Sequence, residues 1–209
     1  MLRKARKRRA TNDSSSDTDD EDSLVQRCGA SVYFHSDVTK KSVMRLLKLL
    51  NEAAEVALPR SEVPSEAKIV LFIHSYGGDV YAGLSAMDHI SNFRVPVWTC
   101  VDGYVASAAT FILLGGKRRF GMPSSRLLVH QLSTGFYGKY KDLVDEATNS
   151  KALMTLFSKI YTSRTCLTAK QVEKMLSSEK DISFQTSVSH GFVEGAWPPV
   201  SNNHIRWDG

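Results

Sequence analysis

Apolar runs alternate with amphipathic stretches along most of the chain, and this alternation predicts its elements. The continuous apolar run at 69–73 is typical of a strand that is buried on both faces, as in a parallel sheet, and the mostly apolar segment at 95–101 predicts a second buried strand. Shorter apolar segments at 31–35, 119–122 and 127–130 predict further strands. The sequence therefore predicts a sheet with a strongly apolar centre.

Apolar residues at helical spacing predict helices between and after these strands. The expected helices cover residues 38–57, 80–92, 106–114, 139–162 and 168–176. Gly103 is expected to turn the chain from the second buried strand into the third helix. Strands that alternate with helices indicate an α/β fold with a largely parallel central sheet.

The first 26 residues have almost no apolar content and carry two opposite charge blocks. Residues 3–9 hold six Lys or Arg side chains, and residues 13–22 hold six Asp or Glu side chains. A basic block of this length also occurs in nuclear-localisation and nucleic-acid-binding segments, but here the adjacent acids partly neutralise it. We therefore expect residues 1–26 to form a disordered charged tail, residues 27–209 to form one domain, and no nucleic-acid partner.

Composition excludes several classes of protein. The chain has 209 residues, of which 42% are apolar and 23% charged, as in an ordinary globular domain and unlike a disordered chain. Its three cysteines form no CxxC motif, so neither a disulfide scaffold nor a cysteine zinc site is expected.

No apolar run reaches the ~18 residues of a membrane span, and acids follow the basic start where a signal peptide would have an apolar core. The expected location is the cytoplasm or another reducing intracellular compartment.

Three positions are candidates for chemistry, although each also has a structural explanation. Gly77 and Gly78 follow a strand and precede a helix, where they let the backbone approach a ligand, yet most such pairs are simple turns. Ser107 lies among small residues at a strand-to-helix turn, where a helix N-terminus favours an oxyanion, yet a serine there is also a common helix cap. His130 ends an apolar segment, and a single histidine is more often structural than catalytic.

These positions belong to motifs that, in this order, resemble those of the Clp protease proteolytic subunits. The segment SYGGDVYAG at 75–83 resembles SPGGxxxxG, GYVAS at 103–107 resembles the nucleophile motif GxxAS, and MPSSRLLVHQ at 122–131 resembles the histidine motif LPNSRxMIHQ. The resemblance covers about residues 30–197. It implies the ClpP/crotonase-like α/β fold, with largely parallel sheets, flanking helices and a protruding handle formed by helix 139–162.

The resemblance implies a role for each matching residue of a serine endopeptidase. Ser107 matches the nucleophile, His130 the general base, and Asp181 the acid that orients the imidazole. The backbone N–H groups of Gly78 and Ala108 match the oxyanion hole. Without the resemblance, three other acids compete with Asp181 for its role: Asp102, Asp142 and Asp145.

The resemblance also implies how the protein works with partners. It implies two stacked heptameric rings, a tetradecamer, that enclose the catalytic sites and cleave unfolded polypeptides. No segment resembles an ATP-binding P-loop, so ATP would act only through a partner AAA+ unfoldase. No metal, no cofactor in this chain and no membrane partner are expected.

Several residues depart from the family pattern. Tyr76 replaces the proline of SPGG, and Tyr104 and Val105 replace the usual Gln-Ala before Ala-Ser. Asn92 and Asp102 stand where apolar docking residues for the unfoldase are expected. These departures and the charged tail suit a divergent, viral or phage-like branch. Two other functions stay open: a catalytically silent structural subunit of a mixed ring, and an acyl-CoA hydratase or isomerase on the related fold.

Overall fold

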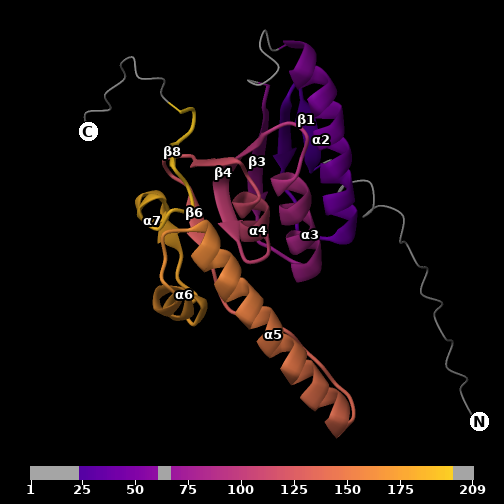
Figure 1. The fold of residues 1–209 in the computed structure, drawn as a ribbon, viewed down its shortest axis with the longest axis vertical. Helices are drawn as coiled ribbons and strands as arrows, with labels where there is room; N and C mark the ends of the chain where they lie inside the picture. The colour runs from indigo at the N-terminus through magenta and orange to yellow at the C-terminus, as the bar shows by residue number, and fades with distance from the viewer. Residues whose placement is uncertain (1–23, 61–66, 200–209) are drawn as a thin grey trace, which may run out of the picture.

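Figure 1 shows the computed structural model, which describes residues 24–60 and 67–199. In chain order its strands are β1 (Val25–Cys28), β2 (Ser31–Phe34), β3 (Ile69–Ser75), β4 (Val97–Ala106), β5 (Arg118–Gly121), β6 (Arg126–Leu128), β7 (Ile182–Ser183) and β8 (Gly195–Ala196). Its helices are α2 (Lys40–Arg60), α3 (Val80–Ser91), α4 (Ala109–Leu114), α5 (Tyr140–Arg164), α6 (Ala169–Leu176) and α7 (Phe184–Ser189). The predictions for residues 1–23, and with them most of the charged tail, lie outside the described residues.

The described strands form one mixed sheet in which most neighbouring pairs are parallel. Its main order is β1-β2-β3-β4-β5-β8, and β6 and β7 lie off this path beside the end of β4. The antiparallel pairs are β1–β2 and β6–β7. Strand β4 changes its neighbour part-way along, because residues 98–101 pair with β5 and residues 104–106 pair with β6. The predicted α/β fold with a largely parallel sheet is confirmed.

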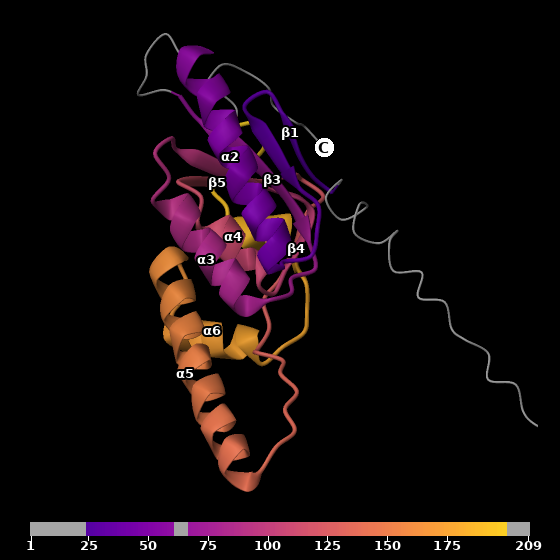
Figure 2. The same cartoon turned by 90° about the vertical axis from the view of Figure 1, so that its right-hand side faces the viewer.

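Helices α2, α3 and α4 pack on one face of the sheet (Figure 2). Beneath them lies the main core, in which Leu71 and Ile73 of β3 are fully buried. The intervening Phe72 belongs to a separate buried cluster with Cys100 and Phe120, on the opposite face because side chains alternate along a strand. Both faces of β3 are therefore covered, which explains why its sequence is an unbroken apolar run.

Aromatic rings surround the smaller cluster and line this second side of the sheet. Tyr33 stacks on Phe72 with ring centroids 4.9 Å apart. Trp197 packs edge-on against Phe72 and Phe120, each time with centroids 5.6 Å apart. We call this surface, formed by Tyr33, Phe72, Trp98, Phe120 and Trp197, the aromatic face. Trp197 ties the end of the described chain to it.

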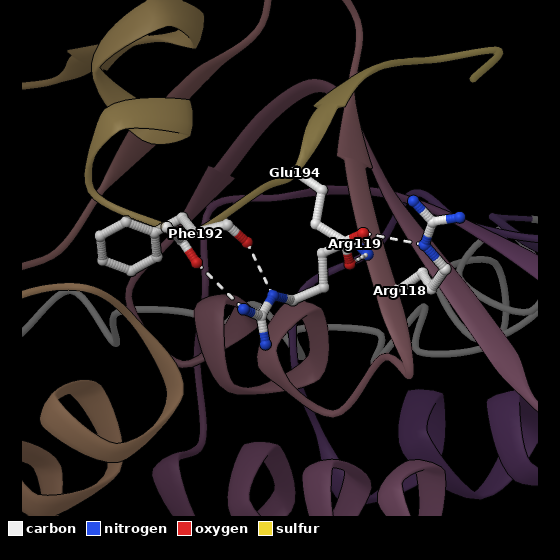
Figure 3. A network of polar contacts seen from close by, with 5 residues as sticks. Arg118, Arg119, Phe192 and Glu194 are labelled. Atoms are coloured by element: carbon white, nitrogen blue, oxygen red, sulfur yellow. Dashed lines mark hydrogen bonds and ion pairs between the residues drawn. The ribbon is translucent and has the colours of Figure 1, made fainter. Parts of the chain in front are cut away.

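Arg119 holds the C-terminal part of the described chain against β5 (Figure 3). Its guanidinium donates to the carbonyl oxygens of Phe192 at 2.9 Å, Gly191 at 3.0 Å and Arg164 at 2.8 Å. Burial lowers the pKa of Arg119 from its ordinary value, and the nearby Glu194 opposes that shift. The Arg119 guanidinium donates to neutral carbonyl oxygens from separate chain segments, so its role is to hold those segments together.

Helix α5 projects away from the body of the molecule (Figure 1), as expected for the handle. Its buried residues, Phe157, Ile160 and Tyr161, all lie in its C-terminal half. Its first turns and the segment before it expose large apolar side chains: Phe136, Tyr137, Tyr140, Leu143 and Val144. Within the two described ranges no helix, α5 included, has the length and apolar character that crossing a membrane requires.

Two predicted boundaries are wrong. Strand β4 does not end before Gly103 but continues to Ala106, because its last three residues pair with β6, and α4 begins only at Ala109. The predicted tail reaches residue 26, whereas Val25 is buried in β1 and pairs with Phe34. The short elements β7, α7 and β8 are absent from the sequence prediction.

Candidate active site

The register of three neighbouring strands brings the predicted nucleophile, base and acid to one end of the sheet. Strand β6 lies between β4 and β7. Ala106, the last residue of β4, pairs with Leu128 of β6, and the N–H of the next residue, Ser107, donates to the Leu128 carbonyl oxygen at 3.0 Å. His130 follows Leu128 by two residues, and Asp181 directly precedes β7. All three candidates therefore stand at strand ends.

Ser107 occupies a sharp turn between β4 and α4. Its φ of 54° is the one positive φ of a non-glycine residue among the described residues, a conformation that costs energy for a residue with a Cβ. Thr110 fixes the turn, because its N–H and its hydroxyl donate to the Ser107 carbonyl oxygen at 2.9 and 2.6 Å. The helix-cap explanation for Ser107 is wrong: Ala108 is the N-cap of α4, and no side chain caps it.

Gly77 and Gly78 are required by close approaches of the backbone. A Cβ on Gly77, whose φ is +105°, would lie 2.6 Å from the Cβ of Ser107. A Cβ on Gly78, whose φ is +141°, would lie 2.4 Å from the Val38 carbonyl oxygen. The two glycines therefore pack the end of β3 against the serine turn on one side and against the start of α2 on the other.

The N–H of Gly78 faces away from the chain segment it pairs with. In the isolated parallel bridge, Val38 donates to the carbonyl oxygen of Gly77 and accepts from the N–H of Asp79, both at 2.7 Å. Since the neighbours of Gly78 make these bonds, its own N–H points the other way. In the described part of the chain, the N–H groups of Gly78 and Ala108 donate no hydrogen bond. Both are free to bind an oxyanion.

A cavity of about 110 Å³ lies between these groups. Four of the five predicted site residues line it: Gly78, Ser107, Ala108 and His130. Its other walls are mostly apolar or aromatic and are formed by Val80, Phe111, Leu132, Phe157 and Tyr161, with Gln131 and Ser133 at its polar side. A larger cavity of about 740 Å³, between α5 and α6, contains none of the five. Because the predicted catalytic side chains line the smaller cavity, we take that cavity as the candidate active site.

Asp181 lies outside this cavity and is held by a different partner. Its Oδ1 accepts a hydrogen bond of 2.9 Å from the hydroxyl of Tyr104. Burial, and then the hydrogen bond and the charge of Asp181, raise the pKa of Tyr104 to about 12. Among the described residues, no hydrogen bond joins Ser107 to His130 or His130 to Asp181. The structure thus brings four predicted residues together and places Asp181 beside them without direct contact.

The competing acids have other positions. Asp102 Oδ2 pairs with His35 Nε2 at 3.0 Å, at the margin of the aromatic face. Asp142 accepts from the backbone N–H of Lys139 at 3.2 Å and so caps α5. Asp145 is an exposed residue of the same helix. The strand register favours Asp181 over all three as the partner of the cavity histidine.

Tyr104 is a residue of the site that sequence reasoning recorded only as a departure from the family pattern. Its ring packs against that of Tyr76, with centroids 5.3 Å apart. Two departures that are 28 positions apart in the sequence therefore form one contact. Their shared aromatic character was a signal, but only the sheet register relates them to Asp181.

The described residues contain no group of three or more His, Cys, Asp or Glu side chains arranged to hold a metal ion.

Comparison with known proteins gives two findings. The family model described as Clp protease matches residues 36–197, a range that includes all five predicted site residues. The ATP-dependent Clp protease proteolytic subunit 2 of Treponema denticola is 29% identical over 182 residues, which cover 84% of this chain and 86% of that protein.

Proposed function

The chain belongs to the Clp protease family, and we propose that it is a serine endopeptidase in which Ser107 attacks the peptide bond. The family and the fold make it a ClpP-type peptidase. The observation that carries the finer assignment is that Ser107 and His130 line one small cavity together with the two unbonded N–H groups of Gly78 and Ala108.

The proposed reaction proceeds through an acyl-enzyme. His130 takes the proton of the Ser107 hydroxyl while the oxygen attacks the peptide carbonyl, and then gives that proton to the leaving amine. The N–H groups of Gly78 and Ala108 bind the oxyanion of the tetrahedral intermediate, where each donor contributes ~3–4 kcal/mol in known hydrolases. Water then attacks the acyl group with His130 as the base, and Ser107 leaves with its proton restored.

Asp181 completes the proposed triad by accepting a hydrogen bond from the imidazole of His130. This contact fixes the tautomer and stabilises the imidazolium that forms during the reaction. Catalytic hydrogen bonds are often long in the absence of substrate and tighten in the complex. The strand register, which puts Asp181 next to the segment carrying His130, supports the assignment.

Unfolded polypeptides are the proposed substrates. An extended substrate chain pairs as an additional strand with an exposed backbone edge of the enzyme. The main-chain hydrogen bonds that recognise it tolerate many sequences. The segment after Gly78 and the loop at 132–138 are the edges to which it would add. Phe111 and Phe157 give the cavity an apolar wall for one side chain of the substrate.

We propose that the chain assembles into two stacked heptameric rings and that ATP acts only through a partner AAA+ unfoldase. The exposed apolar side chains at the start of α5 support contacts between copies of the chain. The aromatic face is the surface proposed for the unfoldase. The hydrogen-bonded side chains of Asp102 and His35 at its margin mean that the partner must also accept polar groups there.

The direct test is reaction of Ser107 with a fluorophosphonate and hydrolysis of a fluorogenic peptide. Wild-type protein should be labelled and active, and Ser107→Ala should lose the label and ~10⁴–10⁶-fold in kcat, while its far-UV circular dichroism is unchanged. Substantial activity in purified Ser107→Ala protein would disprove the assignment. Absence of labelling in the wild type would instead indicate a catalytically silent subunit.

A further inference from the structure

The C-terminal end of β4 and the residue after it supply two side chains that bear on the proposed triad. Ser107 follows the last residue of β4, and Tyr104 lies three positions earlier, within the part that pairs with β6. The Tyr104 hydroxyl donates to Asp181 Oδ1 at 2.9 Å. The proposed nucleophile and the hydrogen-bond donor to the acid are thus three positions apart at the same end of β4.

The sheet register places the three side chains of interest on one face. Tyr104 pairs with Arg126 of β6, and Arg126 pairs with Ser183 of β7. Side chains two or four positions apart along an extended chain share a face. Asp181 precedes Ser183 by two residues, and His130 follows Arg126 by four. The hydroxyl of Tyr104 therefore reaches Asp181 across β6 on the same face that leads to His130.

Asp181 has little else to fix it. It is exposed, and the strand that it precedes has only two residues, so few ladder hydrogen bonds hold the neighbouring backbone. Tyr104, by contrast, lies inside a ten-residue strand, and its ring is packed against Tyr76. The hydrogen bond therefore connects a carboxylate that lies just outside a short strand to the side chain of a long, well-packed one.

We propose that Tyr104 is a positioning residue, which holds Asp181 by Oδ1 and leaves Oδ2 to accept the hydrogen bond from His130. This inference rests on the proposed serine peptidase function. An ionised carboxylate has about four acceptor sites, so the two bonds do not compete. The pKa of about 12 keeps the phenol of Tyr104 protonated, and hence a donor, throughout the range in which a serine peptidase works.

Tyr104→Phe tests the proposal, because it removes the hydroxyl and keeps the ring that packs on Tyr76. With a fluorogenic peptide we expect kcat to fall about tenfold and KM to change less than about twofold, because the lost hydrogen bond orients the acid and does not touch the substrate. Tyr76→Phe is the matched control: it removes the hydroxyl from the partner ring and should leave kcat unchanged.

A double-mutant cycle shows whether the effect passes through the acid. In an Asp181→Asn background, Tyr104→Phe should cause no further loss of kcat. The hydroxyl of Tyr104 acts by orienting the carboxylate of Asp181, and the Asn variant has no carboxylate to orient. An equal additional loss in that background would overturn the proposal. So would a wild-type kcat in Tyr104→Phe, or an increased one, since the hydroxyl would then be idle or would hold Asp181 away from His130.

A spectroscopic readout separates this inference from the proposed function. The ¹⁵N chemical shifts of the His130 ring report which nitrogen carries the proton, and a held Asp181 fixes one tautomer. We expect a single tautomer in the full-length wild type and a mixture in Tyr104→Phe, with the His130 signal assigned from a His130→Gln sample. If fluorophosphonate labelling fails while the tautomer still responds to Tyr104→Phe, the peptidase assignment falls and the positioning role stands. An unchanged tautomer would overturn the positioning role.

Discussion

At the scale of single residues, Gly78 combines two demands that no other residue type meets. It supplies an unbonded N–H to the cavity, and it passes so close to the chain before α2 that a side chain would meet the Val38 carbonyl oxygen. The close approach to Val38 and the proposed oxyanion role of the N–H therefore both require a residue without a Cβ at this position.

Gly78→Ala should therefore destabilise the protein as well as inactivate it. We expect a loss of about 2 kcal/mol or more in the free energy of unfolding, from the strained φ and the clash with Val38, measured by denaturant titration. Gly135→Ala is the matched control, because no atom lies within 4 Å of the added Cβ, and it should stay within about 0.5 kcal/mol of wild type. Equal stability of the two variants would contradict the close packing at Gly78.

Asp181→Asn should lower kcat by ~10³–10⁴-fold without unfolding the protein, since an amide cannot stabilise the imidazolium as a carboxylate does. Asp181 is exposed, so its replacement removes little packing. Asp145→Asn, on the exposed side of α5, should leave peptide hydrolysis unchanged. A crippled Asp145→Asn beside an active Asp181→Asn would show that the acid has been misplaced.

At the scale of elements, the sequence predicts best those segments whose burial is uniform. The apolar runs of β3 and β4 are recognisable because both faces are covered, and α5 because it is long. Gly103 was misleading: it suggests a turn, yet it lies within β4 at a φ of +89°, where a Cβ would lie 3.0 Å from His74 Nδ1. Strands β7 and β8 have two residues each, too few for any periodicity.

The features of the candidate site also differ in how well the sequence predicts them. Ser107 and His130 were predicted from the order of short motifs, and the structure places both at one cavity. The contact between Tyr104 and Asp181 joins positions 77 residues apart and exists only because β6 separates β4 from β7. No local pattern carries that information, because it is a property of strand order.

The C-terminal elements depend on one half-buried side chain, Arg119. Arg119→Met should reduce the free energy of unfolding by about 2–4 kcal/mol, because it leaves the carbonyl groups of Phe192, Gly191 and Arg164 without their donor. Arg118→Met is the control: its ion pair with Glu194 is exposed, and such pairs contribute about 1 kcal/mol or less. Denaturant unfolding of both variants measures the difference, and equal losses would refute the role of Arg119.

At the scale of the whole molecule, the first turns of α5 have too little to pack against. Leu143 and Val144 are exposed, and the aromatic residues just before them are more so. A single copy of the chain leaves this end of the handle uncovered, as expected for a subunit whose partner is another copy.

Light scattering of the full-length protein should give a mass near fourteen times 23.2 kDa. In the assembly that the family resemblance implies, the handle helix α5 joins the two rings. Leu143→Lys should therefore lower that mass to about half, because a charge at the handle weakens the contact between rings more than the contacts within one ring. A stable and active monomer at micromolar concentration would contradict the proposed assembly. An unchanged mass in Leu143→Lys would place the ring contact elsewhere.

The left-handed backbone at Ser107 also bears on how such a chain would change over evolutionary time. At a φ of 54° glycine is the residue that fits without strain, and asparagine is better tolerated than serine. A lineage in which this subunit no longer cleaved peptides would gain stability from drifting to either residue, with nothing to oppose the drift. Selection for catalysis would therefore preserve a strained serine at this turn. In an inactive paralogue, we expect this serine to be among the first residues replaced.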